Sequence, residues 1–165
     1  MCLLLTEDAT RHILTEDLVV YKILLRSLET GTLYSPFRSV RYEIGKVFKS
    51  YLALPTNQGM TVRQPNGYDE YQVGLGRVSE GLHGYLTLEG AQNSFLMTER
   101  RKNSHYWERA IIFKARVPAG SVIYYGVFED NEPSFAANQL IIDEPLECHW
   151  KGNLIVHGHY PSNSI

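Results

Sequence analysis

The sequence predicts a single α+β domain with a mostly antiparallel, strand-rich sheet and few short helices. Two observations carry this prediction: short apolar runs outnumber helical patterns, and no internal repeat interrupts them. The chain has 165 residues, enough for one ordinary domain and too few for two full-sized ones. Hydrophobic residues make up 44% and charged residues 21%, which excludes a disordered chain.

The first half of the chain is expected to be irregular around one strong strand. Residues 1–18, with a weak helical pattern, are interpreted as a lead-in to a domain over 19–160. Residues 19–25 (VVYKILL) are apolar and β-branched, which is typical of a buried strand. A broken strand pair is predicted over 42–54. Residues 55–80, rich in proline, asparagine and glycine, are predicted to form a long loop or a loose hairpin.

The second half contains clearer signals. Thr87 is predicted to be the N-cap of a helix that continues to about Met97. A charge run over 99–102 then indicates a solvated segment. Further strands are predicted over residues 81–86, 109–117, 121–127, 139–142 and 154–157.

Charge and composition exclude several classes of function. Sixteen Lys and Arg against eighteen Asp and Glu give a formal charge of −2, which argues against a duplex-DNA binder. No run approaches the ~20 apolar residues of a membrane helix. Cys2 and Cys148 make no disulfide framework. We therefore expect a cytoplasmic protein without membrane association.

The eleven tyrosines raise the question of what their rings contact. His83 lies between Gly81 and Gly84, and strand glycines often allow another backbone or a planar ligand to come close. His83 is thus either a ligand-contacting imidazole or a structural histidine beside a tight bend. Tyr85 is the tyrosine that we expect to face a ligand, whereas Tyr21 belongs to an apolar strand.

Two other patterns were weighed for binding. Arg38 and Arg41 alternate with aromatic residues and could hold a phosphate and stack a base, although a solvated strand face is the favoured interpretation. Cys148-His149 and the His157-Gly-His159 pair contain zinc-ligand types, but their spacing fits no standard zinc site, so no metal is predicted. Neither a nucleophile elbow nor a phosphate-binding glycine loop is present.

Several phrases together resemble small uncharacterised proteins of bacteriophages and gut bacteria. They include Ser35-Pro-Phe-Arg38, Tyr42-Glu-Ile-Gly-Lys46, Gly81-Leu-His-Gly-Tyr-Leu-Thr87, Val117-Pro-Ala-Gly-Ser121 and Asn138-Gln-Leu-Ile-Ile142. The resemblance covers roughly residues 19–143 and implies a phage- or mobile-element-encoded accessory factor that works in the host cytosol. It implies no established activity.

A more distant resemblance is to the ADP-ribosyltransferases. Gly81-Leu-His-Gly-Tyr85 followed by Ala91 is similar to a cofactor-side strand and helix of that family, with His83 where the family has its nicotinamide-stacking tyrosine. Tyr21-Lys22 stands where the family grips NAD. The resemblance implies a related fold and NAD as cofactor. The sequence departs from the family at the catalytic glutamate. Its nearest candidates, Glu132 and Glu144, lie on either side of the strand over 138–142 and not within it.

Three functions follow as hypotheses. The first is an accessory protein that binds a nucleotide-like ligand or a host protein through His83, Tyr85, Tyr21, Lys22, Arg38 and Arg41. The second is a transferase that moves ADP-ribose from NAD to a host macromolecule, with Glu132 or Glu144 as its carboxylate. The third is a structural component of a virion.

Overall fold

The computed structural model describes residues 2–27, 29–36, 40–101, 108–146, 148–150 and 153–155. Over these residues the chain is strand-rich, with antiparallel pairing and one helix, α1 (Leu88–Arg101). The predicted α+β class with a mostly antiparallel sheet is therefore confirmed. Within the part of the chain that is described, no helix has the length and apolar character needed to cross a bilayer.

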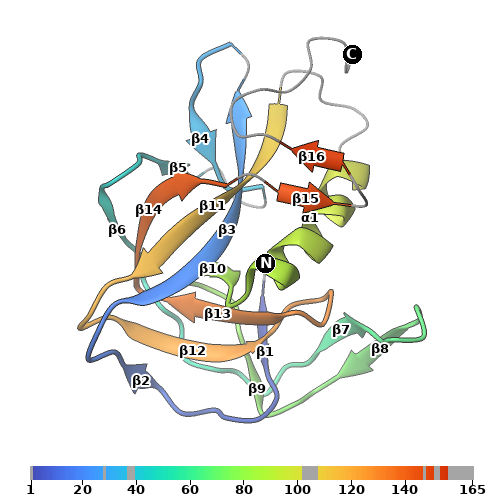
Figure 1. The fold of residues 1–165 in the computed structure, drawn as a ribbon. Helices are drawn as coiled ribbons and strands as arrows, with labels where there is room; N and C mark the ends of the chain where they lie inside the picture. The colour runs from blue at the N-terminus through green and yellow to red at the C-terminus, as the bar shows by residue number, and fades with distance from the viewer. Residues whose placement is uncertain are drawn as a thin grey trace.

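The described strands form one large sheet that divides into two halves of different direction. In Figure 1 β3 and β11 of the first half run diagonally, whereas β12 and β13 of the second half run almost horizontally. The first half, in sheet order, consists of β6 (Val47–Lys49), β14 (Gln139–Pro145), β11 (Glu108–Val117) and β3 (Leu18–Ser27). The second half continues with β10 (Leu82–Tyr85), β13 (Pro133–Ala137), β12 (Val122–Val127), β1 (Leu3–Leu5) and β9 (Gly76–Val78).

Short strands branch from two inner strands of this sheet. β4 (Leu33–Tyr34) pairs with β3 and with β5 (Arg41–Tyr42), and β2 (His12–Ile13) pairs with β12. Two small separate sheets complete the described strands, one of β7 (Met60–Arg63) with β8 (Asp69–Gln72), the other of β15 (Cys148–Trp150) with β16 (Asn153–Ile155).

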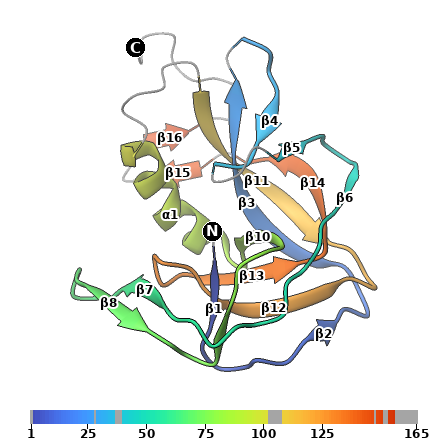
Figure 2. The same cartoon turned by 180° about the vertical axis from the view of Figure 1, so that it is seen from behind.

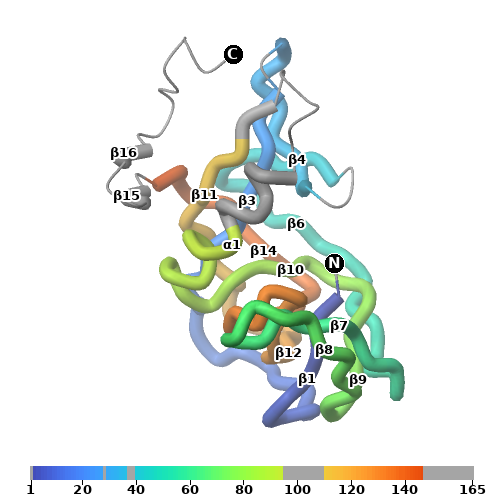
Figure 3. The backbone as a smooth tube through the Cα atoms, turned by 90° about the vertical axis from the view of Figure 1, so that its right-hand side faces the viewer, coloured from blue at the N-terminus to red at the C-terminus, as the bar shows by residue number. Residues whose placement is uncertain are grey.

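The core fills both faces of the sheet. On one face Ile23, Leu25 and Ile112 pack with Ala91 of α1. On the opposite face Val20, Leu24 and Phe113 pack with Leu33 and Tyr42 of the β4–β5 segment. Figure 3 shows α1 and the β4–β6 segment on opposite sides of β3 and β11. Strands buried on both faces explain why the segment 19–25 is apolar without alternation.

The N-terminal segment is an integral part of the sheet, which corrects its interpretation as a lead-in with a weak helical pattern. Leu3, Leu4 and Leu5 are fully buried, and β1 lies between β12 and β9. Gly126 of β12 permits this approach, because a Cβ there would lie 2.1 Å from the carbonyl oxygen of Leu4. Figure 2 shows β1 crossing the lower half of the molecule from behind.

The segment 55–80 is more ordered than a long loop. It contains the hairpin of β7 and β8, with Met60 opposite Gln72, followed by β9 in the main sheet. The hairpin alternative is therefore confirmed. β13 (Pro133–Ala137) lies buried between β10 and β12 and was not predicted, because proline, serine and alanine are weak strand formers.

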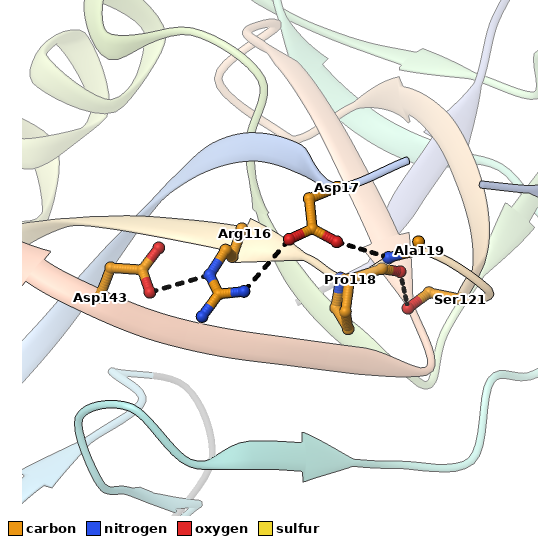
Figure 4. A network of polar contacts seen from close by, with 6 residues as sticks. All are labelled: Asp17, Arg116, Pro118, Ala119, Ser121 and Asp143. Carbon is orange, nitrogen blue, oxygen red and sulfur yellow. Dashed lines mark hydrogen bonds and ion pairs between the residues drawn. The ribbon is translucent and has the colours of Figure 1, made fainter. Parts of the chain in front are cut away.

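The predicted connection between the long strands β11 and β12 is fixed by a polar network. Asp17 accepts hydrogen bonds from the main-chain N–H of Ala119 (2.8 Å) and from the guanidinium of Arg116 (3.1 Å), and Arg116 also donates to Asp143 (3.1 Å). Figure 4 shows these side chains with Pro118 and Ser121. The chain entering β3 is thereby tied to the turn that follows β11.

Candidate functional site

The candidate site lies where the two halves of the sheet separate, between β3 and β10. β3 pairs with β11 along its full length, from Leu18 opposite Val117 to Ser27 opposite Glu108. With β10, by contrast, β3 shares a single register pair, Tyr21 opposite Tyr85. The strands diverge beyond this pair, and their divergence opens a split in the sheet.

A pocket of about 60 Å³ occupies this split. That volume is several times the ~10–15 Å³ that one water molecule needs. The lining combines β3, β10, the segment after β4, Tyr42 of β5 and Ser50, with Phe128 on the far side. The lining residues are Lys22, Ile23, Ser35, Pro36, Val40, Tyr42, Ser50, Gly81, Leu82, His83, Gly84, Tyr85 and Phe128.

The space left by the two glycines on either side of His83 is filled by neighbouring protein atoms. A Cβ on Gly84 would lie 2.7 Å from the Phe135 ring and 2.8 Å from the carbonyl oxygen of Tyr21. Gly81 has a φ of +149°, and a Cβ there would lie 2.7 Å from the Leu52 side chain. The close approach predicted from the sequence is therefore an approach of neighbouring strands and side chains.

Lys22 is a buried cation at the wall of the pocket. Its side chain is 6% exposed, and its ammonium donates a hydrogen bond to the main-chain carbonyl of His83. The same nitrogen lies 5.4 Å from the centre of the Tyr42 ring, a cation–π distance. No ion pair between Lys22 and a described carboxylate is found. Loss of hydration alone lowers its pKa to about 8.

His83 presents an unpartnered nitrogen in the same region. Its Nδ1 lies 2.9 Å from the carbonyl oxygen of Gly81. Because a carbonyl only accepts, Nδ1 carries the proton and Nε2 of the neutral ring is an acceptor. Nε2 is buried and has no hydrogen-bond partner among the described residues. Burial, and then the charge of Lys22, lower the pKa of His83 to about 3, so the ring is neutral at physiological pH.

Tyr85 connects the pocket to a half-buried carboxyl group, that of Asp130. Its ring packs edge-on against Phe128, with centroids 5.2 Å apart, and its hydroxyl donates to Asp130 at 3.2 Å. Ser94 of α1 donates a second hydrogen bond to the same oxygen. Burial, followed by the charge of Asp130, raises the pKa of Tyr85, and burial raises the pKa of Asp130 against the opposing effect of the Ser94 hydrogen bond. Tyr85 is thus a neutral donor held in one orientation.

The two candidate glutamates lie outside the pocket lining. Glu132 accepts a hydrogen bond from the Asn93 amide at 2.9 Å and borders Gly90 near the start of α1. Glu144 is exposed on β14, where its carboxylate lies 3.9 Å from the Lys114 ammonium. The structure therefore does not bring either glutamate together with Lys22 and His83 at the pocket.

The remaining predicted residues are less central. Tyr21 is half-buried next to Tyr85 in register and packs against the α1-side core. Arg41 is exposed on β5 opposite Tyr34 and does not line the pocket. Arg38 lies outside the described residues.

The Cys and His residues near the C-terminus, for which no zinc site is predicted, lie only partly within the described residues. Of these residues, the structure gives the backbone of Cys148 and His149 in β15. His157 and His159 lie outside the described residues. Among the described side chains, no group of three or more His, Cys, Asp or Glu is arranged to hold a metal ion.

Three residues at the candidate site, Asp130, Ser94 and Phe128, were not predicted from the sequence. Asp130 and Ser94, which are 36 residues apart, meet at the hydroxyl group of Tyr85. No local sequence motif predicts this contact. Phe128 follows a strand predicted to end at Val127. Tyr42 had only a weak signal, its position beside Arg41, whereas its actual role is to cover Lys22.

Neither a family model, nor a curated protein, nor a solved structure matches the chain. The chemistry must be argued from the pocket itself. Its lining combines one cationic side chain (Lys22) with aromatic residues (Tyr42, Tyr85 and Phe128).

Proposed function

We propose that this protein binds a nucleotide-like small molecule whose anionic group enters the pocket between β3 and β10, while the rest of the ligand lies outside the pocket. The ammonium of Lys22 would hold an anionic group of the ligand, such as a phosphate. The observation that carries the proposal is that Lys22 is almost fully buried, lines a pocket and has no carboxylate partner among the described residues.

The physical reason is the energy of a buried charge. Removing an ammonium from water costs several kcal/mol unless an opposite charge and hydrogen bonds compensate for it. At Lys22 the compensation is partial, since it consists of one main-chain carbonyl and the face of Tyr42. An anion bound beside Lys22 would complete it, and lysine is a common phosphate ligand.

The order of the elements also supports the proposal. The resemblance to ADP-ribosyltransferases predicts that the strand with Lys22, the strand with His83 and the helix with Ala91 follow one another around a cofactor. In this chain β3 and β10 are neighbours and Lys22 donates to the His83 carbonyl, whereas Ala91 packs on the face of the sheet opposite Tyr42. We therefore propose an ADP-ribosyltransferase-like fold with a ligand of the NAD or ADP-ribose type.

Transfer of ADP-ribose has less support than binding. A transferase needs a carboxylate beside the reacting bond, and Glu132 and Glu144 contact Asn93 and Lys114 instead. Incubation with labelled NAD and host lysate distinguishes the two functions. Binding alone predicts that NAD is not consumed and that no macromolecule becomes labelled.

Calorimetry with matched ligands tests the proposed function. The panel contains NAD, ADP-ribose and a cyclic nucleotide, together with AMP and its uncharged counterpart adenosine. We expect heat from at least one anionic member, binding at least tenfold weaker for adenosine than for AMP, and a loss of tenfold or more in Lys22→Met. Lys46→Met is the control, because Lys46 is exposed and paired with Glu43.

Two results would overturn the small-molecule proposal. One is an anionic ligand that binds Lys22→Met as tightly as the wild type. The other is an absence of heat with every member of the panel, accompanied by a stable partner recovered from host lysate. The second result would leave the function of binding a host protein.

A further inference from the structure

We propose that Lys22 is a carbonyl-reactive amine, which forms an imine with a small uncharged aldehyde or ketone that enters the β3–β10 pocket. This proposal concerns the same pocket as the proposed function. It goes beyond the proposed function because imine formation at Lys22 requires no nucleotide.

The surroundings of Lys22 favour a neutral amine more than those of an ordinary lysine. The side chain is buried, and no ion pair with a described carboxylate holds its proton. Loss of hydration lowers the pKa of Lys22 to about 8, so roughly a tenth of the molecules carry the free amine at pH 7. A lysine with the ordinary pKa of about 10.4 would have well under 1% of its amine free. Desolvated lysines of this kind serve as nucleophiles toward carbonyl compounds.

The geometry leaves the lone pair of that amine available. A neutral amine keeps two hydrogens, and one of them can remain on the carbonyl oxygen of His83. The lone pair does not take part in that bond. Because Lys22 lines the pocket, a carbonyl carbon that enters the pocket comes within reach of the nitrogen.

The pocket also sets the size and polarity of the substrate. A volume of about 60 Å³ admits a compound of a few heavy atoms. Apart from Lys22 itself, the described lining contains no cation, which favours an uncharged substrate when Lys22 is neutral.

The reaction balances without a further reagent. The Lys22 nitrogen attacks the carbonyl carbon, a C–N bond forms, and a proton moves from nitrogen to oxygen to give a carbinolamine. The hydroxyl then leaves as water with the second nitrogen proton, and a C=N bond remains. Aldehyde and amine are thus converted to imine and water, with neither oxidation nor reduction.

Reductive labelling of the wild-type chain tests the proposal. The protein is treated at pH 7.5 with a limiting amount of propionaldehyde and cyanoborohydride, which reduces the imine to a stable secondary amine, and labelling of each lysine is measured by peptide mass spectrometry. We expect Lys22 to be labelled at least tenfold faster than Lys46, Lys49 and Lys114, which are more exposed. The preference should disappear in 6 M guanidinium chloride.

The result that would overturn the proposal is labelling of Lys22 no faster than that of Lys46 in the folded protein. The outcome is separable from that of the proposed function. Preferential labelling without nucleotide binding supports the reactive amine and contradicts anion capture. Nucleotide binding without preferential labelling supports anion capture and contradicts the reactive amine. If both hold, saturating ADP-ribose should slow the labelling of Lys22 at least tenfold.

Discussion

The ammonium of Lys22 donates a hydrogen bond to the main-chain carbonyl of His83 across the split between β3 and β10. In a continuous antiparallel ladder that carbonyl would be available to a main-chain N–H of the neighbouring strand. Here the strands share only the pair of Tyr21 and Tyr85, and a side chain takes the place of the next ladder contact. The same divergence that opens the pocket thus places a buried cation in it.

Replacing Lys22 with an apolar residue should stabilise the protein while it impairs ligand binding. Lys22→Met relieves the cost of burying an ammonium but leaves the His83 carbonyl without its donor, which costs about 1 kcal/mol. We expect a net gain of about 1–2 kcal/mol in the free energy of unfolding at pH 7, measured by urea denaturation. Lys46→Met should change it by less than about 0.5 kcal/mol. A destabilised Lys22→Met would show that the charge is well compensated in the free protein.

The stability of the wild type should rise with pH above neutrality. The pKa of Lys22 is about 8 in the folded state against 10.5 in the unfolded state, so the unfolded chain binds more protons between these values. The free energy of unfolding then increases with pH, by on the order of 2 kcal/mol between pH 7 and 9.5. The raised pKa values of Tyr42 and Tyr85 act oppositely, above about pH 10. Denaturation of wild type and Lys22→Met at several pH values measures the effect, and equal pH dependence in both would contradict it.

His83 should make the protein acid-sensitive. Its pKa is about 3 in the folded state and 6.5 in the unfolded state, so the stability that it provides is complete above pH 6.5 and is lost as pH falls toward 3. The loss from pH 7 to 4.5 is on the order of 2 kcal/mol. His83→Gln, which does not titrate, should show a correspondingly flatter acid limb in thermal denaturation. An identical acid limb in the variant would rule out a neutral, buried His83.

The glycine after His83 should be intolerant of a side chain. In Gly84→Ala the new methyl group would collide with the Phe135 ring and with the main chain of Tyr21, and we expect a loss of about 2–4 kcal/mol. Gly90→Ala is the matched comparison. A Cβ there would lie 3.0 Å from Oγ1 of Thr87 and 3.1 Å from the Glu132 carboxylate, contacts that a small shift relieves, and alanine favours the helix by up to about 1 kcal/mol. The melting temperatures of the two variants test this prediction, and we expect the lower value for Gly84→Ala. Equal melting temperatures would contradict the close packing of β10.

Local pattern predicted the long strands but not the elements that depend on distant partners. The runs in β3, β11 and β12 are apolar and β-branched, so their burial can be read from the residues themselves. β1 is three leucines long and has no periodicity to detect. Its burial depends on Gly126, more than a hundred residues away in the chain.

In the candidate site, too, the residues themselves were predictable from local pattern, whereas their tertiary contacts were not. Lys22, His83 and Tyr85 were predicted to share a ligand, and they line one pocket. Their environments were not predictable, because the Tyr42 ring over Lys22 and the Asp130 carboxylate behind Tyr85 arrive through tertiary contacts. The glutamates were chosen for their position relative to a strand, and that position does not determine the direction in which they point.

The proposed function depends on contact between Lys22 and an anionic ligand. The pKa of Lys22 measures that contact directly. The protein is labelled with ¹³C-lysine, and the Lys22 Cε resonance is titrated by NMR with and without saturating ADP-ribose. We expect a pKa near 8 in the free protein and an increase of at least one unit in the complex, because a phosphate beside the ammonium favours its charged form. An unchanged pKa at saturation, or a failure of ADP-ribose to bind at millimolar concentration, would contradict the account.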